Sequence, residues 1–354
     1  MYQNMKKIGV ATFFPNDNYG CLLQAFSLQK CLSELGYDAE VIYFEPNWRF
    51  FTSKKNFLHV LYALCRYYRR HFLLKKWIFP GIKCSKSYHS ISEIELETYD
   101  ILIAGSDQIW HPRCFAQQNG GLDFYFLNFC HKTKKRIAYA PSLSVLSWPA
   151  NFYNQVKPLL KKFNFISVRE KSSEIYLKSL GFDRTVCVCD PTILHKASFY
   201  EKNFDLKSSD EKKQPFVFLI REVVQADLIN DLCNHAKIIS MRKMKSVVSV
   251  RNWLDYIYNS DFVITDSFHC VVFCLLFHKK FIVLLNESTK YEMNERFVSL
   301  IGRAKLAYRC VNSKDLLETI KEKLFKEIDW KIVDSILDEM RDFSLNWLKN
   351  ALEK

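Results

Sequence analysis

A histidine stands between two apolar runs in the stretch "DFVITDSFHCVVFCLLF" at residues 261–277. The first run is typical of a buried strand and the second of a buried helix, so His269 falls in the first turn of that helix, beside Ser267 as a capping residue. Free backbone N–H groups and the positive end of the helix dipole favour an anion there. An imidazole at this place can donate to a phosphate or carboxylate and pass a proton to a reacting carbon or oxygen. The alternative is a capping-region histidine bonded to a backbone carbonyl.

Two other predicted strands end in polar residues. In "AGSDQIWHP", Ser106 belongs to the turn, Asp107 could orient a hydroxyl or act as a base, and Trp110 offers a platform for the face of a sugar. The alternative is an ordinary Gly-Ser-Asp turn. In "VCDPT", we interpret Asp190 only as marking the exit from the first domain.

Two further segments supply candidate anion and hydrogen-bonding groups. In "SVRE", Arg169 can fork onto a phosphate or carboxylate, or form a structural pair with Glu170. In "NDNYG", Asn18, Tyr19 and Gly20 open a helix and place backbone N–H groups and an amide toward the expected cleft. Plain helix capping explains these residues equally well.

The elements that must position these residues alternate regularly along the chain. Predicted strands lie in a first series at 8–14, 39–44, 100–106, 136–142, 165–170 and 185–190, and in a second at 215–220, 237–241, 261–267 and 281–285. Helical patterns between them indicate parallel sheets covered by helices on both faces. We expect an α/β protein with two doubly wound, Rossmann-like domains facing a central cleft, where ligands collect at the carboxyl ends of the strands.

Charge and composition suggest where the domains begin and end. The charged stretch 201–214 indicates a linker, which places the first domain at 1–200 and the second at 215–325. The first domain includes a basic helical excursion at about 46–92, and a terminal helix at 326–354 is expected to pack back on one of the domains. With 354 residues, 49% of them hydrophobic, the chain can bury two cores.

The cysteines and the apolar runs favour a cytoplasmic protein. The 12 cysteines show neither a C-x-x-C pair nor metal-ligand spacing, so we interpret them as reduced core residues and expect no metal site. No apolar run is long enough for a signal peptide or a membrane span.

The net charge of +13 is mostly local. Between Pro46 and Ser92 there are ten Lys and Arg residues and no Asp or Glu. This segment resembles a basic amphipathic helix that lies on an anionic membrane surface, which would place the protein peripherally at the inner face of the cell membrane. The alternative is a helix whose apolar face packs on its own domain. Nucleic acid is not an expected partner, because no reading motif accompanies the basic segment.

The motifs together resemble the polysaccharide pyruvyltransferase family. "NDNYGCLLQAFSLQ", "DILIAGSDQIWHP", "KRIAYAPS", "SVRE", "VCDPT" and "SDFVITDSFHCVVFCLLF" occur in the order and approximate spacing of that family, from about residue 7 to about residue 310. The resemblance implies a fold similar to the two-domain glycosyltransferase B architecture. It also implies transfer of pyruvate from phosphoenolpyruvate to two hydroxyls of a sugar, which forms a cyclic ketal and releases phosphate. The acceptor would be a surface polysaccharide of the capsule or exopolysaccharide type, or its lipid-linked precursor.

The resemblance also suggests roles for the candidate residues. His269 would be the general acid, and Asp107 would orient or deprotonate the acceptor. The donor would be bound by Arg169, Ser267, His269 and Arg296, and the cleft or acceptor site would be lined by Asn18, Tyr19, Gly20, Ser106 and Trp110. No cofactor is implied besides phosphoenolpyruvate as the donor substrate. One position departs from the family pattern, because Cys270 stands where family members usually carry glycine. A cysteine there would crowd a ligand that approaches the backbone, unless the position is helical.

Two other function classes fit parts of the sequence. A nucleotide-sugar-dependent glycosyltransferase of the same two-domain architecture would also place anion-binding helix ends in the cleft. Cys270 favours another alternative, a protein without catalytic activity that binds a glycan or an anion. Stabilisation by phosphoenolpyruvate, as opposed to UDP or GDP sugars, distinguishes the first class from the predicted pyruvyltransferase.

Overall fold

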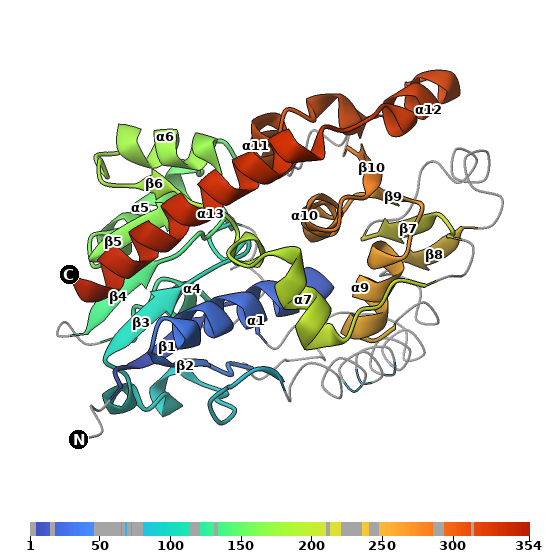
Figure 1. Cartoon of the computed structure of the whole chain (residues 1–354). Helices are drawn as coiled ribbons and strands as arrows, with labels where there is room; N and C mark the ends of the chain where they lie inside the picture. The colour runs from blue at the N-terminus through green and yellow to red at the C-terminus, as the bar shows by residue number, and fades with distance from the viewer. Residues whose placement is uncertain are drawn as a thin grey trace.

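Two parallel sheets, one in each half of the chain, form the framework of the protein (Figure 1). The computed structural model describes residues 5–14, 18–45, 81–112, 121–130, 134–209, 213–220, 236–240, 248–285, 294–312 and 315–354, together with Cys65, Tyr68 and Phe72. Most of the predicted basic excursion, and with it the proposed membrane-binding helix, lies outside the described residues. None of the helices that the structure describes combines the length and the apolarity needed to cross a bilayer.

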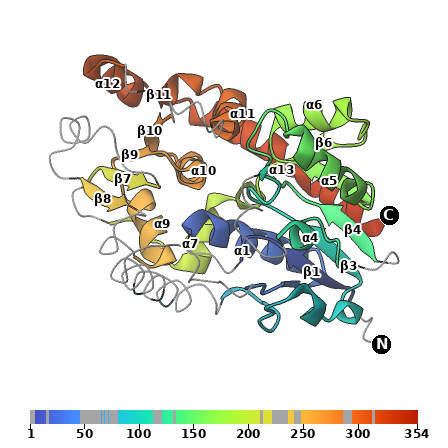
Figure 2. The same ribbon diagram turned by 180° about the vertical axis from the view of Figure 1, so that it is seen from behind.

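The first sheet has six strands in the order β2-β1-β3-β4-β5-β6, all parallel. The strands are β1 (Lys7–Ala11), β2 (Asp38–Val41), β3 (Ile101–Ala104), β4 (Lys135–Ala138), β5 (Phe165–Val168) and β6 (Val186–Cys187). The helices α1 (Tyr19–Glu34), α4 (Gly121–Tyr125), α5 (Ala150–Leu160) and α6 (Lys171–Ser179) connect them, with short 3-10 turns at Ile91–Glu93 and Leu96–Thr98. Helices cover both faces of this sheet, as its buried, β-branched strands require (Figure 2).

The second sheet has five strands in the order β11-β10-β9-β7-β8, also parallel. Its strands are β7 (Phe216–Leu219), β8 (Lys237–Ser240), β9 (Phe262–Thr265), β10 (Lys280–Leu284) and β11 (Cys310–Val311). The helices that the structure describes here are α9 (Val250–Tyr258), α10 (Phe268–Leu276), α11 (Glu295–Arg303) and α12 (Leu317–Phe325), with a 3-10 turn at Ala307–Arg309. Neither β11 nor α12 was predicted from the sequence.

Both sheets reverse their strand order once, between β1 and β3 in the first and between β7 and β9 in the second. In doubly wound sheets such a reversal opens a crevice at the carboxyl ends of the strands, and ligands bind there. Asp107, in the loop after β3, and His269, in the first turn of the helix α10 that follows β9, lie at these two crevices. The topology therefore brings together the two residues predicted to be catalytic.

The predicted strands are present, but most are shorter than predicted. The predicted segments 100–106, 165–170 and 185–190 leave the ladder at Ala104, Val168 and Cys187. Their polar ends turn away from the sheet because they contact each other at its edge, as described below. The predicted linker is also shorter at its start: residues 201–204 are the last turn of α7 (Ala197–Phe204), which ends at Asp205 with a left-handed φ of 48°. The charges of that turn mark an exposed helix surface and not a linker.

The C-terminal helix α13 (Trp330–Glu353) crosses from the second half of the chain back over the first sheet (Figure 1). Arg341 Nε donates to the carbonyl of Ile193 at 2.8 Å, and Ser344 Oγ accepts from the N–H of Cys189 at 2.9 Å. Near the end of the helix, Lys135 Nζ donates to the carbonyl of Leu352 at 2.8 Å. The first two bonds tie α13 to the segment that carries Asp190, and the third ties it to β4.

Tyr19 joins the two domains. Its ring stacks on Trp253 with centroids 5.1 Å apart and an interplanar angle of 12°, and its hydroxyl donates to the carbonyl of Val248 at 3.0 Å. The same hydroxyl accepts from the N–H of Val248 at 3.0 Å. Because Tyr19 is 0% exposed, the prediction that it lines the cleft is wrong: it is a buried contact that holds α1 against the second domain.

Candidate active site

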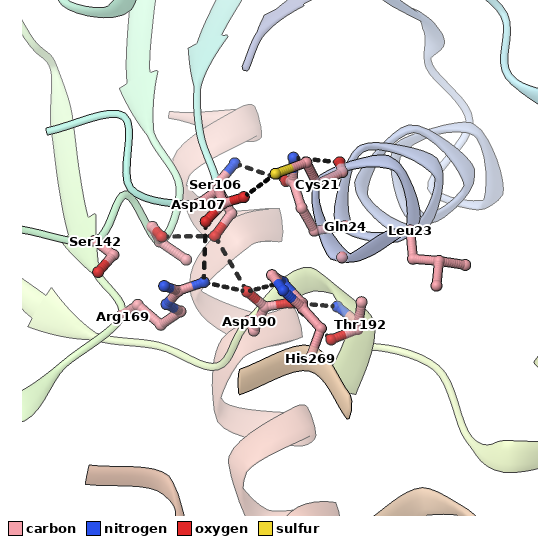
Figure 3. A network of polar contacts seen from close by, with 12 residues as sticks. Cys21, Leu23, Gln24, Ser106, Asp107, Ser142, Arg169, Asp190, Thr192 and His269 are labelled. Carbon is pink, nitrogen blue, oxygen red and sulfur yellow. Dashed lines mark hydrogen bonds and ion pairs between the residues drawn. The ribbon is translucent and has the colours of Figure 1, made fainter. Parts of the chain in front are cut away.

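A buried polar cluster lies where the carboxyl ends of β3, β5 and β6 meet the start of α1 and the start of α10 (Figure 3). The first domain contributes Ser106, Asp107, Arg169 and Asp190, and the second contributes His269. Each of these five side chains is nearly inaccessible to solvent. The cluster therefore spans the domain interface, where Asp190 of the first domain contacts His269 of the second.

Asp190 lies at the centre of this cluster. Its Oδ2 accepts from Arg169 Nη1 at 2.8 Å and lies 3.5 Å from both Ser106 Oγ and His269 Nε2. Its Oδ1 accepts from the N–H and the hydroxyl of Thr192 at 3.0 and 2.7 Å. Burial opposes ionisation, but His269, Arg169 and the Thr192 N–H outweigh it and hold the pKa of Asp190 well below its usual range. Asp190 is therefore a fixed negative charge.

The guanidinium of Arg169 lies close to three carboxylates. Besides Asp190, it donates from Nε to Glu170 Oε1 at 3.3 Å, and Nη1 lies 4.0 Å from Asp107 Oδ1. Burial tends to lower the pKa of Arg169, but these three carboxylates raise it above its ordinary value. Nη2 is buried without a hydrogen-bond partner among the described residues. The structural pair with Glu170 is thus present, and one N–H group of the guanidinium remains for a ligand.

His269 reaches the cluster from the first turn of α10. It is 5% exposed, and its Nε2 makes an ion-pair contact with Asp190 but no hydrogen bond within the described part of the chain. On its other side the ring lies against the backbone of α1, so closely that a Cβ atom on Gly20 would overlap Nδ1 of His269. Gly20 is therefore a spacer that lets α1 approach the imidazole, and it does not line an open cleft.

Replacing Gly20 by alanine is expected to lower kcat by about 100-fold, because a displacement of the imidazole by about 1 Å removes a catalytic group from its working position. The rate of phosphate release from phosphoenolpyruvate with a sugar acceptor measures this. Gly302→Ala is the matched control, since Gly302 is also helical and a Cβ there meets no atom within 4 Å. Equal rates for the two variants would refute the spacer role.

Asp107 and Ser106 bond to side chains of α1. Asp107 has a left-handed φ of 70°, a conformation rare outside glycine, and its Oδ2 accepts from the thiol of Cys21 at 2.8 Å. The hydroxyl of Ser106 donates to the carbonyl of Ala140 at 2.7 Å, and its N–H donates to Gln24 Oε1 at 3.1 Å. Strained backbone that is held by a dense network is typical of functional sites.

A small cavity lined by arginines adjoins the cluster. Its walls include Arg169 and Asp190 from the first domain and Phe268, Arg296 and Arg303 from the second. The guanidinium of Arg169 lies over the ring of Phe268, 4.4 Å from its centroid, and that of Arg296 lies 5.9 Å from it. The volume is about 20 Å³, which is room for about one water molecule. Cationic side chains of both domains therefore line one small space.

Contrary to the prediction, Trp110 and Asn18 do not line a cleft. Trp110 is 0% exposed, stacks on Phe126 with centroids 5.0 Å apart, and donates from Nε1 to the carbonyl of Tyr125. It cannot serve as a platform for a sugar, because its faces are covered by the aromatic core of the first domain. Asn18 is the N-cap of α1 and accepts from the N–H of Gly20 at 2.9 Å, which is the capping alternative.

Ser267 and Cys270 have structural places at the start of α10. Ser267 is the N-cap of this helix, and its hydroxyl accepts from the N–H of Cys270 at 3.4 Å. Cys270 is helical, has an ordinary negative φ and is 0% exposed in the core. The departure from the family glycine therefore needs no unusual backbone conformation.

The central residue of the site, Asp190, was interpreted from the sequence only as a domain exit. The signal available was its position: it stands at the end of a predicted strand, as Asp107 and Arg169 do, and carboxyl ends of parallel strands meet at one edge. Glu170 was noted only as a partner for Arg169, but it also accepts from the hydroxyl of Ser142 at the same edge.

Comparison with solved structures shows which proteins share this fold. The chain matches UDP-N-acetylglucosamine 2-epimerase from Rickettsia bellii with a TM-score of 0.58 and 8% identity, over 98% of this chain and 96% of that one. It matches the Neisseria meningitidis enzyme, solved with UDP-GlcNAc bound, with a TM-score of 0.54 and 10% identity, over 98% of this chain and 99% of that one. At such low identity the likeness shows the fold alone, and it confirms the expected glycosyltransferase B-like architecture of two parallel-sheet domains.

Comparison with models of protein families shows to which family the chain belongs. No curated protein matches the chain. The family model described as polysaccharide pyruvyl transferase matches residues 18–288, a span that runs from the N-cap of α1 past α10 and includes Asp107, Arg169, Asp190 and His269. Because this match covers most of the chain and both domains, the protein belongs to the polysaccharide pyruvyl transferase family.

Proposed function

We propose that the protein transfers pyruvate from phosphoenolpyruvate to two hydroxyls of a sugar in a surface polysaccharide or its lipid-linked precursor, which forms a cyclic ketal and releases phosphate. One observation supports this most directly. A histidine from the second domain lies 3.5 Å from an ionised, buried aspartate of the first, beside a cavity lined by three arginines. This combines a proton donor with cationic groups that suit a phosphate and a carboxylate.

The donor enters between the domains. Arg169 belongs to the first domain, and Arg296 and Arg303 belong to the second, so a trianionic ligand between them would be held by both. A cavity of about 20 Å³ is too small for phosphoenolpyruvate, so the domains open to admit the donor and close around it. The stacking of Tyr19 on Trp253 is one of the contacts that join the two domains.

The chemistry requires one proton donor and one proton acceptor. The imidazolium of His269, paired with Asp190, protonates the methylene carbon of the donor, and the adjacent carbon becomes electrophilic. The first sugar hydroxyl adds to that carbon, and the second displaces phosphate as the carbon–oxygen bond to phosphate breaks. One hydroxyl proton restores the imidazolium and the other leaves on phosphate. Asp107, at the same strand edge, orients the attacking hydroxyl.

The decisive experiment separates donor choice from turnover. Purified protein is expected to be stabilised against thermal unfolding by phosphoenolpyruvate but not by UDP-GlcNAc or GDP-mannose. Incubation with phosphoenolpyruvate and a panel of lipid-linked or nitrophenyl glycosides is expected to yield a pyruvate adduct in the mass spectrum together with stoichiometric phosphate. Stabilisation by the nucleotide sugars alone, with transfer of their sugar, would show instead that the protein is a glycosyltransferase.

A further inference from the structure

A second hollow, much larger than the arginine-lined cavity, lies between α6, α11 and α13, where the two domains meet. It has a volume of about 610 Å³, which is within the range of small-molecule binding sites. We infer that this hollow binds the saccharide acceptor. The inference extends the proposed function. It rests on that function for the identity of the donor site, which is the neighbouring arginine-lined cavity.

The hollow has the wall composition that sugars require. Phe343 of α13 lines it and is 54% exposed, and Val298 of α11 beside it is also 54% exposed. Together these two exposed side chains give the hollow one apolar wall, built from α13 and α11. The electron-rich face of the ring packs against the C–H groups on one face of a pyranose. Phe343 is thus the platform that was sought at Trp110.

Polar groups surround this platform. Glu295, Ser299 and Arg303 line the hollow from α11, and Lys171 and Glu174 line it from α6. Lys171 Nζ is paired with Glu174 Oε2 at 2.7 Å, whereas Glu295 and Arg303 form no ion pair with any other residue that the structure describes. A carboxylate can accept from sugar hydroxyls, and a guanidinium can donate to them. The hollow therefore combines one apolar face with a polar rim, as a saccharide site does.

The hollow also has the right position. Ser299 and Arg303 line both the hollow and the arginine-lined cavity, so the two spaces share a wall. The N–H of Lys171 lies 3.5 Å from Ser299 Oγ, so this wall is also a contact between the two domains. When the domains open to admit the donor, the shared wall opens with them, and a sugar on Phe343 then presents its hydroxyls toward the donor carbon.

The test measures sugar binding without turnover. Saturation-transfer NMR of the full chain with methyl glycosides of glucose, galactose and mannose gives the dissociation constant of each. Phe343→Ala is expected to weaken binding by about tenfold, while Phe343→Tyr, which keeps the ring, retains it. Ile332→Ala is the matched control, because Ile332 is an exposed apolar residue of the same helix, 43% exposed, that does not line the hollow.

The outcomes separate this inference from the proposed function. Binding that is lost in Phe343→Ala and kept in the other two variants, with stabilisation by phosphoenolpyruvate unchanged, supports the acceptor site. Absence of binding by the wild type, or equal binding by wild type and Phe343→Ala, overturns it. If the wild type transfers pyruvate with an acceptor KM that Phe343→Ala leaves unchanged, only the acceptor site is wrong. If sugars bind through Phe343 but phosphoenolpyruvate has no effect, the donor assignment fails instead.

Discussion

Replacing His269 by asparagine is expected to lower kcat for pyruvyl transfer by about 10²–10⁴-fold, the usual contribution of a general acid. The second domain places this imidazole 3.5 Å from Asp190, and an amide of similar size cannot deliver its proton to the methylene carbon. Steady-state phosphate release with a sugar acceptor measures kcat. Binding of phosphoenolpyruvate, followed by thermal stabilisation, is expected to change much less than the rate.

A second histidine provides the control for this substitution. His278 lies just beyond α10, on the surface, where its Nε2 pairs with Asp334 at 2.8 Å and its side chain is 44% exposed. His278→Asn is expected to leave kcat within about twofold of wild type, because exposed pairs contribute little. A kcat for His269→Asn as high as that of His278→Asn would rule out His269 as the acid.

Replacing Asp190 by asparagine is expected to lower the free energy of unfolding by about 3–5 kcal/mol, the usual cost of removing one partner of a buried ion pair. The loss is large because Arg169 and His269 would then be buried without the charge that they share. Denaturant unfolding followed by circular dichroism measures the change. Asp334→Asn is the matched control: Asp334 contacts His278 Nε2 at 2.8 Å with its side chain 50% exposed, so a change below about 1 kcal/mol is expected.

The contribution of Asp190 also has a defined dependence on pH. Since its pKa is lower in the folded protein than in the unfolded chain, the unfolded state binds more protons as the solution becomes acidic. The stabilisation is fully present above the ordinary carboxyl pKa of about 4 and is lost as the pH falls toward the lower folded value. The difference in the free energy of unfolding between wild type and Asp190→Asn is therefore expected to be constant from pH 7 to about pH 5 and to shrink below about pH 4. A difference that grows on acidification would contradict this account.

Much of the site could be predicted because it depends on local pattern. Runs such as "DILIAGS" and "DFVITDS" end in polar residues, and parallel strands bring such ends to one edge of a sheet. Asp107, Arg169 and His269 were found in this way, and the structure brings them to one cluster. A sequence pattern does not show how exposed a side chain is in the folded protein. Trp110 was therefore misjudged, since the aromatic residues that cover it come from elsewhere in the chain.

The amino-acid sequence by itself determined the two parallel-sheet domains, the strand ends that carry chemistry and the family, because hydrophobic period and short motifs are properties of neighbouring residues. Only the tertiary structure decided that Asp190 is the centre of the site, that Gly20 is a spacer for His269, and that Phe343 borders a hollow beside the arginines. Each of these depends on contacts between elements far apart along the chain, and it is the packing of α1, α10 and α13 that brings them together. A one-dimensional pattern does not record which side chains that packing buries and which it leaves facing a ligand.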